Sequence, residues 1–317
     1  MSSESASLES LLDRRLSSLR NSRPELEPAL DLQELLIRTT LGAVRPPQAE
    51  PLLVPRERAA SYIRSGVPLL HDQPVTLDVH FAADLFSRLV NALQQREHAE
   101  LGPRIQALVA AATGGLLDPQ RLFAEAFVQH EEHLVELALQ ADVDAELLTT
   151  LAHWAVAPVL SAYSNQIMTI VDNLNDGTLR GAAWQRGYCP VCGAWPLLGE
   201  WRGVELAEFL RCSGCAVAWR WQRLACPYCG NDDYRTLQTL QVEGERRFRI
   251  NVCERCGGYL KVGNAFDPLV AALLSLDDIV SMHLDVVAIE RGYQRPGGTG
   301  FAIELAVPEA EWLEELA

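Results

Sequence analysis

The stretch RCSGCAVAWRWQRLACPYCG, residues 211–230, places four cysteines within twenty positions. Two more pairs flank it, in CPVCG at 189–193 and in CERCG at 253–257. All 8 cysteines of the chain lie in C-x-x-C pairs, which we call knuckles 1 to 4 in chain order. A knuckle can offer two sulfur atoms to one metal ion from a single tight turn. We therefore predict that the four knuckles bind metal.

The expected cellular setting favours metal binding over disulfide formation. The chain has 317 residues, of which 48% are hydrophobic and 22% charged, as in folded globular proteins. No apolar run reaches the roughly 20 residues of a membrane helix, and the N-terminus lacks the apolar core of a secretory signal. We expect a cytoplasmic protein without membrane insertion, in which thiols stay reduced.

The residue after the second cysteine of each knuckle determines how the chain can turn. Gly193, Gly230 and Gly257 can take a positive φ at this place. Ala216 occupies the same place in knuckle 2. We therefore expect knuckle 2 to turn in another way.

The four knuckles can combine into two sites in three ways. Neighbouring pairing joins knuckle 1 with 2 and 3 with 4, cross-brace pairing joins alternate knuckles, and nested pairing joins the middle two. An internal repeat bears on the choice, because YCPVCG and RCSGCAVAWR are followed by ACPYCG and VCERCGGYLK, each half enclosing a hairpin-like stretch. A repeated unit should close on itself, so we favour neighbouring pairing, with cross-brace pairing as the alternative.

The distribution of charge argues against a nucleic-acid partner. From Arg186 to Lys261 the chain carries eleven Arg and Lys against eight Asp and Glu, a net charge of +3, whereas the whole chain carries −15. Metal-bound thiolates would lower the local charge further, so this region offers no basic stripe for a phosphate backbone. An acidic helical part beside a nearly neutral metal region suits docking to a folded protein.

The chain outside the knuckles has the periodicity of helices. Apolar residues recur at intervals of three and four, which predicts helices over 26–44, 75–95, 118–140, 145–174 and 267–293. Asp118 is expected to cap the third of these, with Pro119 in its first position. The helix over 145–174 is apolar nearly all round, so we expect it to be central and buried, and kinked or divided at Pro158.

Over residues 184–262 the sequence pattern changes from that of helices to that of short strands. Alternating apolar and polar residues around Arg202-Gly203 and around Glu243-Gly244 predict two hairpins. Trp219 and Trp221 could stack on a base or dock a partner. However, a small metal-binding β-ribbon needs large aromatic side chains packed against it. We predict that both tryptophans pack against the metal hairpins.

His130 and His133 lie three residues apart in the predicted helix over 118–140. They could share a metal ion, but no third ligand is apparent in the sequence and the H-E-x-x-H pattern is absent. We interpret the pair as part of a solvated helix face.

The order of the motifs YCPVCG, FLRCSGCAVAWRWQRLACPYCG and CERCGGYLKV, followed by VAALLSLDDIV and RGY, resembles the formate dehydrogenase accessory protein family, the FdhE type. The resemblance covers roughly residues 184–293. It implies a cytoplasmic maturation factor without catalytic residues, which binds the catalytic subunit of formate dehydrogenase during assembly. It also implies two rubredoxin-like sites that hold two metal ions, with iron favoured over zinc. The ligands that it implies are Cys189, Cys192, Cys212, Cys215, Cys226, Cys229, Cys253 and Cys256.

Periodicity and resemblance together predict an α+β fold. We expect a helical domain over 1–183, a first rubredoxin-like four-cysteine module over 184–224, a second over 225–264, and a C-terminal helix and tail over 265–317. Four sulfur ligands would leave a metal ion no open position for a substrate, although one-electron iron chemistry stays allowed. Two other functions therefore remain as alternatives, a rubredoxin-like electron-transfer protein and a zinc-ribbon interaction module.

Overall fold

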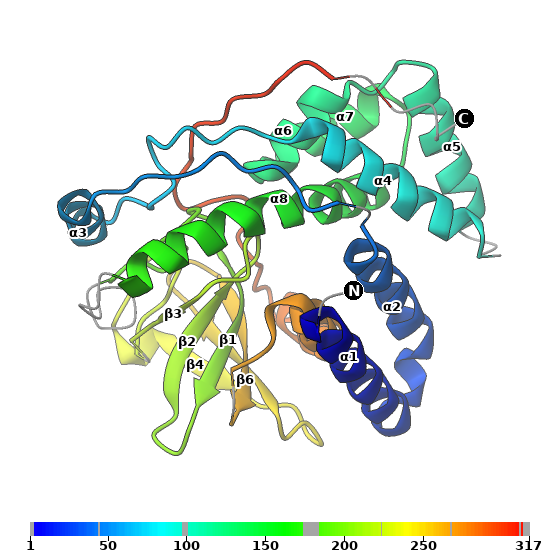
Figure 1. The fold of residues 1–317 in the computed structure, drawn as a ribbon. Coiled ribbons are helices and arrows are strands. Elements are labelled where there is room, and N and C mark those ends of the chain that lie inside the picture. Colours follow the sequence, from blue (N-terminus) through cyan, green and yellow to red (C-terminus); the bar gives the residue numbers. More distant parts are fainter. Residues whose placement is uncertain are drawn as a thin grey trace.

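The computed structural model describes residues 3–43, 45–96, 101–173, 184–222, 224–266, 268–310 and 312. In Figure 1, a layer of helices lies across one end of a β-sheet, and the N-terminal helices stand beside the sheet, next to the helices that follow it. The described residues thus form the α+β fold that the sequence predicts, with the knuckles in the sheet region and helices before and after it.

The helical layer is built around α8, Ala145–Asn173. This helix packs against α4 (Val79–Gln94), α6 (Pro119–Phe127) and α7 (Glu131–Gln140), as Figure 1 shows. The prediction of a central helix is confirmed. Pro158 does not divide the helix, because the neighbouring helices pack along α8 and hold it together across the missing backbone hydrogen bond.

The predicted helix over 118–140 is in fact two helices. Helix α6 ends and α7 begins on either side of Gln129, which has a left-handed backbone with φ 58°. Asp118 caps α6 as predicted, and its carboxylate accepts a hydrogen bond of 3.0 Å from the backbone N–H of Gln120. Other helices before the sheet are α1 (Ser3–Ser22), the 3₁₀ helix η1 (Pro24–Leu26), α2 (Glu27–Leu41), α3 (Arg56–Ser65) and α5 (Leu101–Thr113). Within the described part of the chain, no helix combines the length and the apolar character that crossing a membrane requires.

The sheet joins two cysteine-bearing halves edge to edge. The first half contributes β1 (Pro196–Arg202), β2 (Ala207–Cys212) and β3 (Ala218–Arg220), and the second contributes β4 (Leu237–Leu240), β5 (Phe248–Cys253) and β6 (Tyr259–Ala265). The strand order is β3-β2-β1-β6-β5-β4, antiparallel within each half. The halves meet where β1 and β6 pair in parallel, with Gly199 opposite Val262. Both predicted hairpins are confirmed as the β1–β2 and β4–β5 connections.

The two halves of the sheet pack mainly into two different hydrophobic cores, with Leu260 and Val262 of β6 in the first of them. The first half packs beneath α4 and α8 through residues such as Val191, Leu210 and Trp219. The second half shares a core with α1, α2 and the C-terminal helices, which are η3 (Ala271–Leu273), α9 (Leu274–Val280) and α10 (Met282–Glu290). The predicted C-terminal helix is therefore divided, and residues near both ends of the chain bury the second half. The expected domain boundaries at 184, 225 and 265 stay a prediction.

The segment after α10 ties both halves to the helical layer. The backbone N–H groups of Gln294, Gly300 and Ala306 each donate a hydrogen bond of 2.9 Å, in turn to knuckle 4, to knuckle 1, and to Val75 just before α4. This C-terminal segment runs over the top of the molecule in Figure 1. The two halves are thus fixed by the chain that follows them as well as by their own pairing.

A buried ion-pair network connects β1, β2 and knuckle 2. Glu200 is fully buried, with Oε1 2.8 Å from Nη1 of Arg211 and Oε2 2.6 Å from Nε of Arg202. Arg211 is buried as well, and its Nε donates to the carbonyl oxygen of Ala216 at 3.0 Å. Removing one partner of such a pair leaves the other charge buried without compensation.

Replacing Arg211 by methionine should therefore lower the free energy of unfolding by about 3–5 kcal/mol. The matched control is Arg235→Met, because Arg235 pairs with Asp233 in an exposed position, where an ion pair contributes about 0–1 kcal/mol. Denaturant unfolding of the metal-loaded protein measures both changes. A loss no larger for Arg211→Met than for the control would contradict the role assigned to the network.

Candidate metal centres

Knuckles 1 and 2 bring four sulfur atoms together, and we call this set the first cysteine site. The Sγ atoms of Cys192 and Cys212 are 3.3 Å apart. The Sγ atom of Cys215 lies 3.6 Å from those of Cys189 and Cys192. All four side chains are buried, at most 5% exposed.

Knuckles 3 and 4 form the second cysteine site. The Sγ atoms of Cys226 and Cys256 are 3.6 Å apart, and those of Cys229 and Cys253 are 3.8 Å apart. In each site the four sulfur atoms lie within 4.8 Å of one another. The structure thus brings together the knuckles that neighbouring pairing predicts, and the cross-brace and nested alternatives are wrong.

The sulfur spacing fits a tetrahedral metal ion. A metal–sulfur distance of about 2.3 Å requires sulfur atoms about 3.8 Å apart at the corners of a tetrahedron. The separations above run from 3.3 to 3.8 Å, well beyond the roughly 2.05 Å of a disulfide bond. Each set of four cysteines can therefore hold one metal ion. The assignment of all eight cysteines as metal ligands stays a prediction.

Electrostatics also favours a cation at the first site. Burial, followed by the neighbouring thiols, raises the pKa of Cys189 far above its ordinary value. Four thiolates in this buried space would repel one another without a positive ion. A bound divalent or trivalent metal supplies the missing charge and deprotonates its thiol ligands.

The same backbone hydrogen bond closes every knuckle. In each, the N–H of the first cysteine donates to the carbonyl oxygen five residues later. The four bonds are Cys189 to Ala194 at 2.8 Å, Cys212 to Val217 at 3.0 Å, Cys226 to Asn231 at 2.8 Å, and Cys253 to Gly258 at 3.0 Å. The internal repeat in the sequence is therefore a repeat of backbone conformation.

Knuckle 2 adopts a left-handed backbone at this place as the other three do, contrary to our expectation. Ala216 has φ 58°, beside φ values of 81°, 69° and 69° at Gly193, Gly230 and Gly257. A left-handed backbone at a residue other than glycine costs about 1–2 kcal/mol. The hydrogen bond from Arg211 to the Ala216 carbonyl holds the residue in this conformation and offsets part of that cost.

The two cysteine sites differ in exposure. The first lies against the helical layer, so closely that a Cβ atom at Gly214 would come within 3.0 Å of Cδ2 of Leu160 on α8. In the second site, Cys229 and Cys256 are exposed. The second site is therefore open to solvent and to a partner, whereas the first is enclosed.

Aromatic side chains connect the two sites. The rings of Trp195, which follows knuckle 1, and Tyr228, within knuckle 3, meet edge to face with centroids 5.5 Å apart. Trp219 and Trp221 are both buried, and Nε1 of Trp221 donates to the carbonyl oxygen of Ala225 at 3.1 Å. The prediction that these two tryptophans pack within the metal region is confirmed.

A third cluster of donor atoms lies on the helical layer. His130 and His133 both have Nδ1 close to Oε2 of Glu125, at 2.9 and 3.0 Å. Hydrogen bonding to Glu125 raises the pKa of His133, and the bonds from His133 and His130 outweigh burial and lower the pKa of Glu125. The sequence did not point to Glu125, because the break at Gln129 that brings α6 and α7 together was not predicted.

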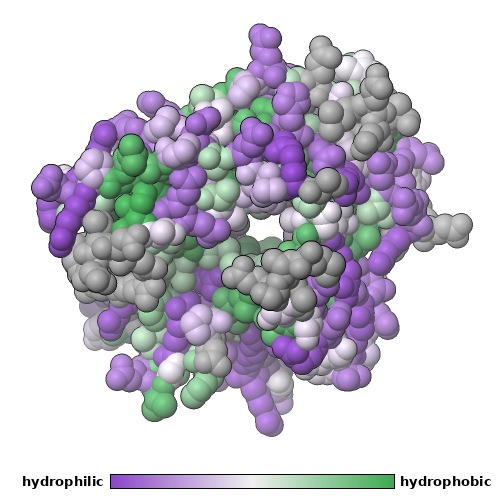
Figure 2. Space-filling model, viewed as in Figure 1, coloured by the Kyte–Doolittle hydropathy of each residue, from purple (hydrophilic) through white to green (hydrophobic). Residues whose placement is uncertain are grey.

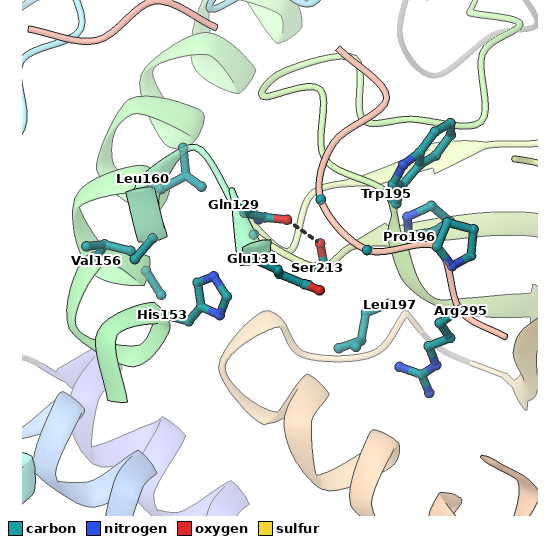
Figure 3. Close-up of a pocket in the computed structure, with 16 residues that line it drawn as sticks. Gln129, Glu131, His153, Val156, Leu160, Trp195, Pro196, Leu197, Ser213 and Arg295 are labelled. Carbon is teal, nitrogen blue, oxygen red and sulfur yellow. Dashed lines mark hydrogen bonds between the residues drawn. The ribbon is translucent and has the colours of Figure 1, made fainter. Parts of the chain in front are cut away.

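A cavity of about 330 Å³ lies beside the first cysteine site, between the helical layer and the start of β1. Its walls include His153 and Leu160 of α8, Trp195, Ser213 of knuckle 2, and Arg295. Figure 3 shows these side chains arranged around one space, and Figure 2 shows this face of the molecule hollowed near its centre. Burial lowers the pKa of His153 to about 4, so the ring is neutral, and its Nε2 has no hydrogen-bond partner among the described residues. The residues that line the cavity come from separate parts of the sequence, so no sequence motif predicted it.

Known proteins resemble the chain in sequence and in fold. No protein-family model matches it. An FdhE homologue from Aquifex aeolicus is 34% identical over 116 residues, which cover 35% of this chain and 40% of that protein. An FdhE homologue from Citrobacter koseri is 26% identical over 306 residues, 90% of this chain and 88% of that protein. In three of the relatives, the matched segment spans 40, 59 and 45% of the relative's own length.

A solved structure has the same fold. The crystal structure of the FdhE protein from Pseudomonas aeruginosa superposes with a TM-score of 0.59 at 24% sequence identity, covering 92% of this chain and 94% of that one. The resemblance predicted from the cysteine motifs is confirmed by the FdhE homologues of similar sequence, and this structure confirms the fold. The predicted order of a helical part, two four-cysteine units and C-terminal helices is also confirmed.

Two glycines at equivalent places should respond differently to substitution. Gly257→Ala meets open space, so it should cost only the roughly 1–2 kcal/mol of a left-handed alanine. Gly193→Ala has the same backbone cost, and its Cβ would also lie 2.1 Å from the carbonyl oxygen of Phe301. We expect the second change to lower the free energy of unfolding at least about twice as much. Equal losses in denaturant titrations would contradict the packing at Phe301.

The difference in exposure predicts two rates of metal loss. A chelator should remove metal from the second site faster, because Cys229 and Cys256 are exposed there. Chelator absorbance followed over time should show a fast and a slow phase of equal amplitude. The variant with both Cys226→Ser and Cys229→Ser should lack the fast phase and keep the slow one. Loss of the slow phase instead would contradict the assignment of the fast phase to the second site, and loss of both phases would show that the sites are not separate.

Proposed function

We propose that this chain, which is related to the FdhE proteins in sequence and fold, is a cytoplasmic accessory protein that binds the catalytic subunit of formate dehydrogenase during its assembly. The observation that carries the proposal is the pair of four-cysteine sites, built in repeat order on one sheet beneath a helical layer. On this proposal the protein is not an enzyme, since four sulfur donors fill the coordination of each ion and leave no position for a substrate.

We propose iron as the metal of both cysteine sites, with zinc as the alternative that the same donors accept. Four thiolates in tetrahedral geometry suit both ions. Iron would add the capacity to exchange one electron, whereas zinc would act only in folding. The two are told apart simply, because ferric tetrathiolate colours a protein red and zinc leaves it colourless. Elemental analysis of protein purified without oxygen, expected to give two ions bound by cysteine per chain, assigns the metal.

The exposed apolar face of α10 supports the proposal that this chain binds another protein. Met282, Val286 and Ile289 are exposed apolar side chains at intervals of four and three, so they lie on one face of the helix. The helix packs on β5 and β6, which adjoin knuckle 4 of the exposed second site. We propose that the α10 face and the second site belong to the surface that contacts the catalytic subunit.

Co-purification tests the proposal. The full-length chain should capture the catalytic subunit of formate dehydrogenase from cells that produce both, and should not oxidise formate by itself. Ile289→Asp should reduce the captured amount, because it places a charge in the apolar face of α10. Val204→Asp is the matched control, since Val204 is also an exposed apolar residue but lies in the β1–β2 turn. The proposal would be wrong if the chain captured no catalytic subunit and cells without this protein still made fully active formate dehydrogenase.

Electron transfer is the second candidate function, and the exposure of Cys229 and Cys256 favours it. A metal ion near the surface can exchange electrons with a redox partner, which the enclosed first site could do less readily. Titration of the iron-loaded protein with a mild reductant separates the two functions. Reversible reduction of the second site without any binding to the catalytic subunit would support an electron carrier.

A further inference from the structure

The cluster of Glu125, His130 and His133 has the composition of a metal site, and it is separate from the cysteine sites. Two imidazole nitrogens and one carboxylate oxygen are a common donor set for zinc and other divalent transition ions. The three donor atoms lie within 4.8 Å of one another. Among the described residues, this is the cluster of histidine and carboxylate side chains whose donor atoms lie close enough together to share an ion.

Backbone geometry holds two of the three donors in register. At the C-terminus of α6, the N–H of His130 donates to the carbonyl oxygen of Glu125 at 2.9 Å, and the N–H of Gln129 donates to that of Ala126 at 3.2 Å. With Gln129 in the left-handed region, these two bonds form the Schellman motif that often ends a helix. The motif folds His130 back over Glu125, so this pair is preset before any ion binds.

The third donor is placed by the start of α7. His130 is the residue that precedes the helix, and the N–H of Leu134 donates to its carbonyl oxygen at 3.2 Å. His133 therefore lies in the first turn, above Glu125, and its ring meets the ring of His130 edge to face with centroids 5.2 Å apart. The side chain of Gln129, at the tip of the turn, accepts a hydrogen bond from Ser213 Oγ at 3.0 Å, which anchors the turn on knuckle 2.

The distances between donor atoms suit a shared ion. A metal–ligand distance of about 2.1 Å sets neighbouring donors about 3.0–3.4 Å apart, depending on whether the geometry is octahedral or tetrahedral. Glu125 Oε2 lies 2.9 and 3.0 Å from the two Nδ1 atoms. The same spacing also serves hydrogen bonds between the carboxylate and protonated imidazoles, so a proton and a metal ion compete for one arrangement. Only small rotations of the exposed rings would exchange one for the other.

The surrounding charge favours a cation. Helix α7 begins with Glu131 and Glu132, and Glu136 lies one turn further on. Glu136 favours a positive charge at His133, and Arg121 of α6 opposes it. The acidic residues offset the positive end of the α7 dipole. The side chains of His130 and His133 are 43 and 48% exposed, while that of Glu125 is 20% exposed. An ion here would therefore be reached from solvent without opening the fold and would keep at least one position free for water.

We propose that Glu125, His130 and His133 form a third metal site, which binds a divalent transition ion of the zinc type through two imidazoles and one carboxylate and leaves an open coordination position. Its nitrogen and oxygen donors distinguish it from the two sulfur sites. It lies beside the cavity, because Gln129 and Glu131 of the same turn line that space. The site is independent of the proposed accessory function.

Metal titration of the full-length protein with both cysteine sites already loaded tests the proposal. Zinc followed by calorimetry should show one additional ion bound per chain. Cobalt used as the probe should give visible bands of nitrogen and oxygen ligation without the intense absorption of thiolate ligation. His133→Ala, His130→Ala and Glu125→Gln should each weaken zinc binding at least about tenfold. His133→Gln is the variant least able to disturb folding, since the side chain is exposed.

The matched control is His80→Ala, because His80 is an exposed histidine of α4 outside any group of candidate ligands. It should bind zinc as the unchanged protein does, and every variant should retain two cysteine-bound ions as proof of folding. Absence of an additional ion would overturn the proposal. So would a zinc affinity that His133→Ala and His133→Gln leave unchanged while both keep their cysteine-bound metals.

Discussion

Four sulfur atoms converge at each cysteine site, and the turns and strands of the sheet are organised around this convergence. A knuckle places two cysteines on one turn, and the turn is closed by a hydrogen bond from the first cysteine to the carbonyl oxygen five residues later. Strands begin or end at these turns: β2 ends at Cys212 and β5 ends at Cys253. A metal ion that binds both knuckles of a half would fix the register of its strands.

The helices cover the two halves of the sheet in different ways. The first half is enclosed beneath α8, and its core is continuous with the core of the helical layer. The second half is covered by α1, α2, α9 and α10, which come from near the two ends of the chain. One site is therefore part of the interior while the other reaches the surface. The same motif, used twice, can thus serve stability in one place and contact with a partner in the other.

The sequence predicted the features that depend on local chemistry. The spacing of the cysteines and the internal repeat predicted the pairing of the knuckles, and turn residues such as Gly203 and Gly244 predicted the two hairpins. The helical periodicity predicted α8, and the pair Asp118-Pro119 predicted the cap of α6. Each of these rests on residues close together in the chain, where backbone preference and side-chain pattern agree.

The features that the sequence did not predict depend on side-chain contacts and on the pairing of separate elements. Ala216 adopts a conformation that its type disfavours, and a bond from Arg211 holds it there. The break at Gln129 is stabilised by Ser213 of knuckle 2, and it brings Glu125 to the two histidines. The parallel pairing of β1 with β6 joins two halves that each look complete alone. A periodicity argument considers one element at a time, so it could not anticipate these arrangements.

X-ray absorption spectroscopy at the edge of the bound metal tests whether each cysteine site holds one ion on four sulfur ligands. The measurement is best made on metal-loaded His133→Ala protein, so that ions on nitrogen donors do not contribute. We expect four sulfur neighbours at about 2.3 Å around each ion, and no metal–metal contribution. A shell that contains nitrogen or oxygen, or a nearby second metal of a bridged cluster, would contradict two separate four-cysteine centres.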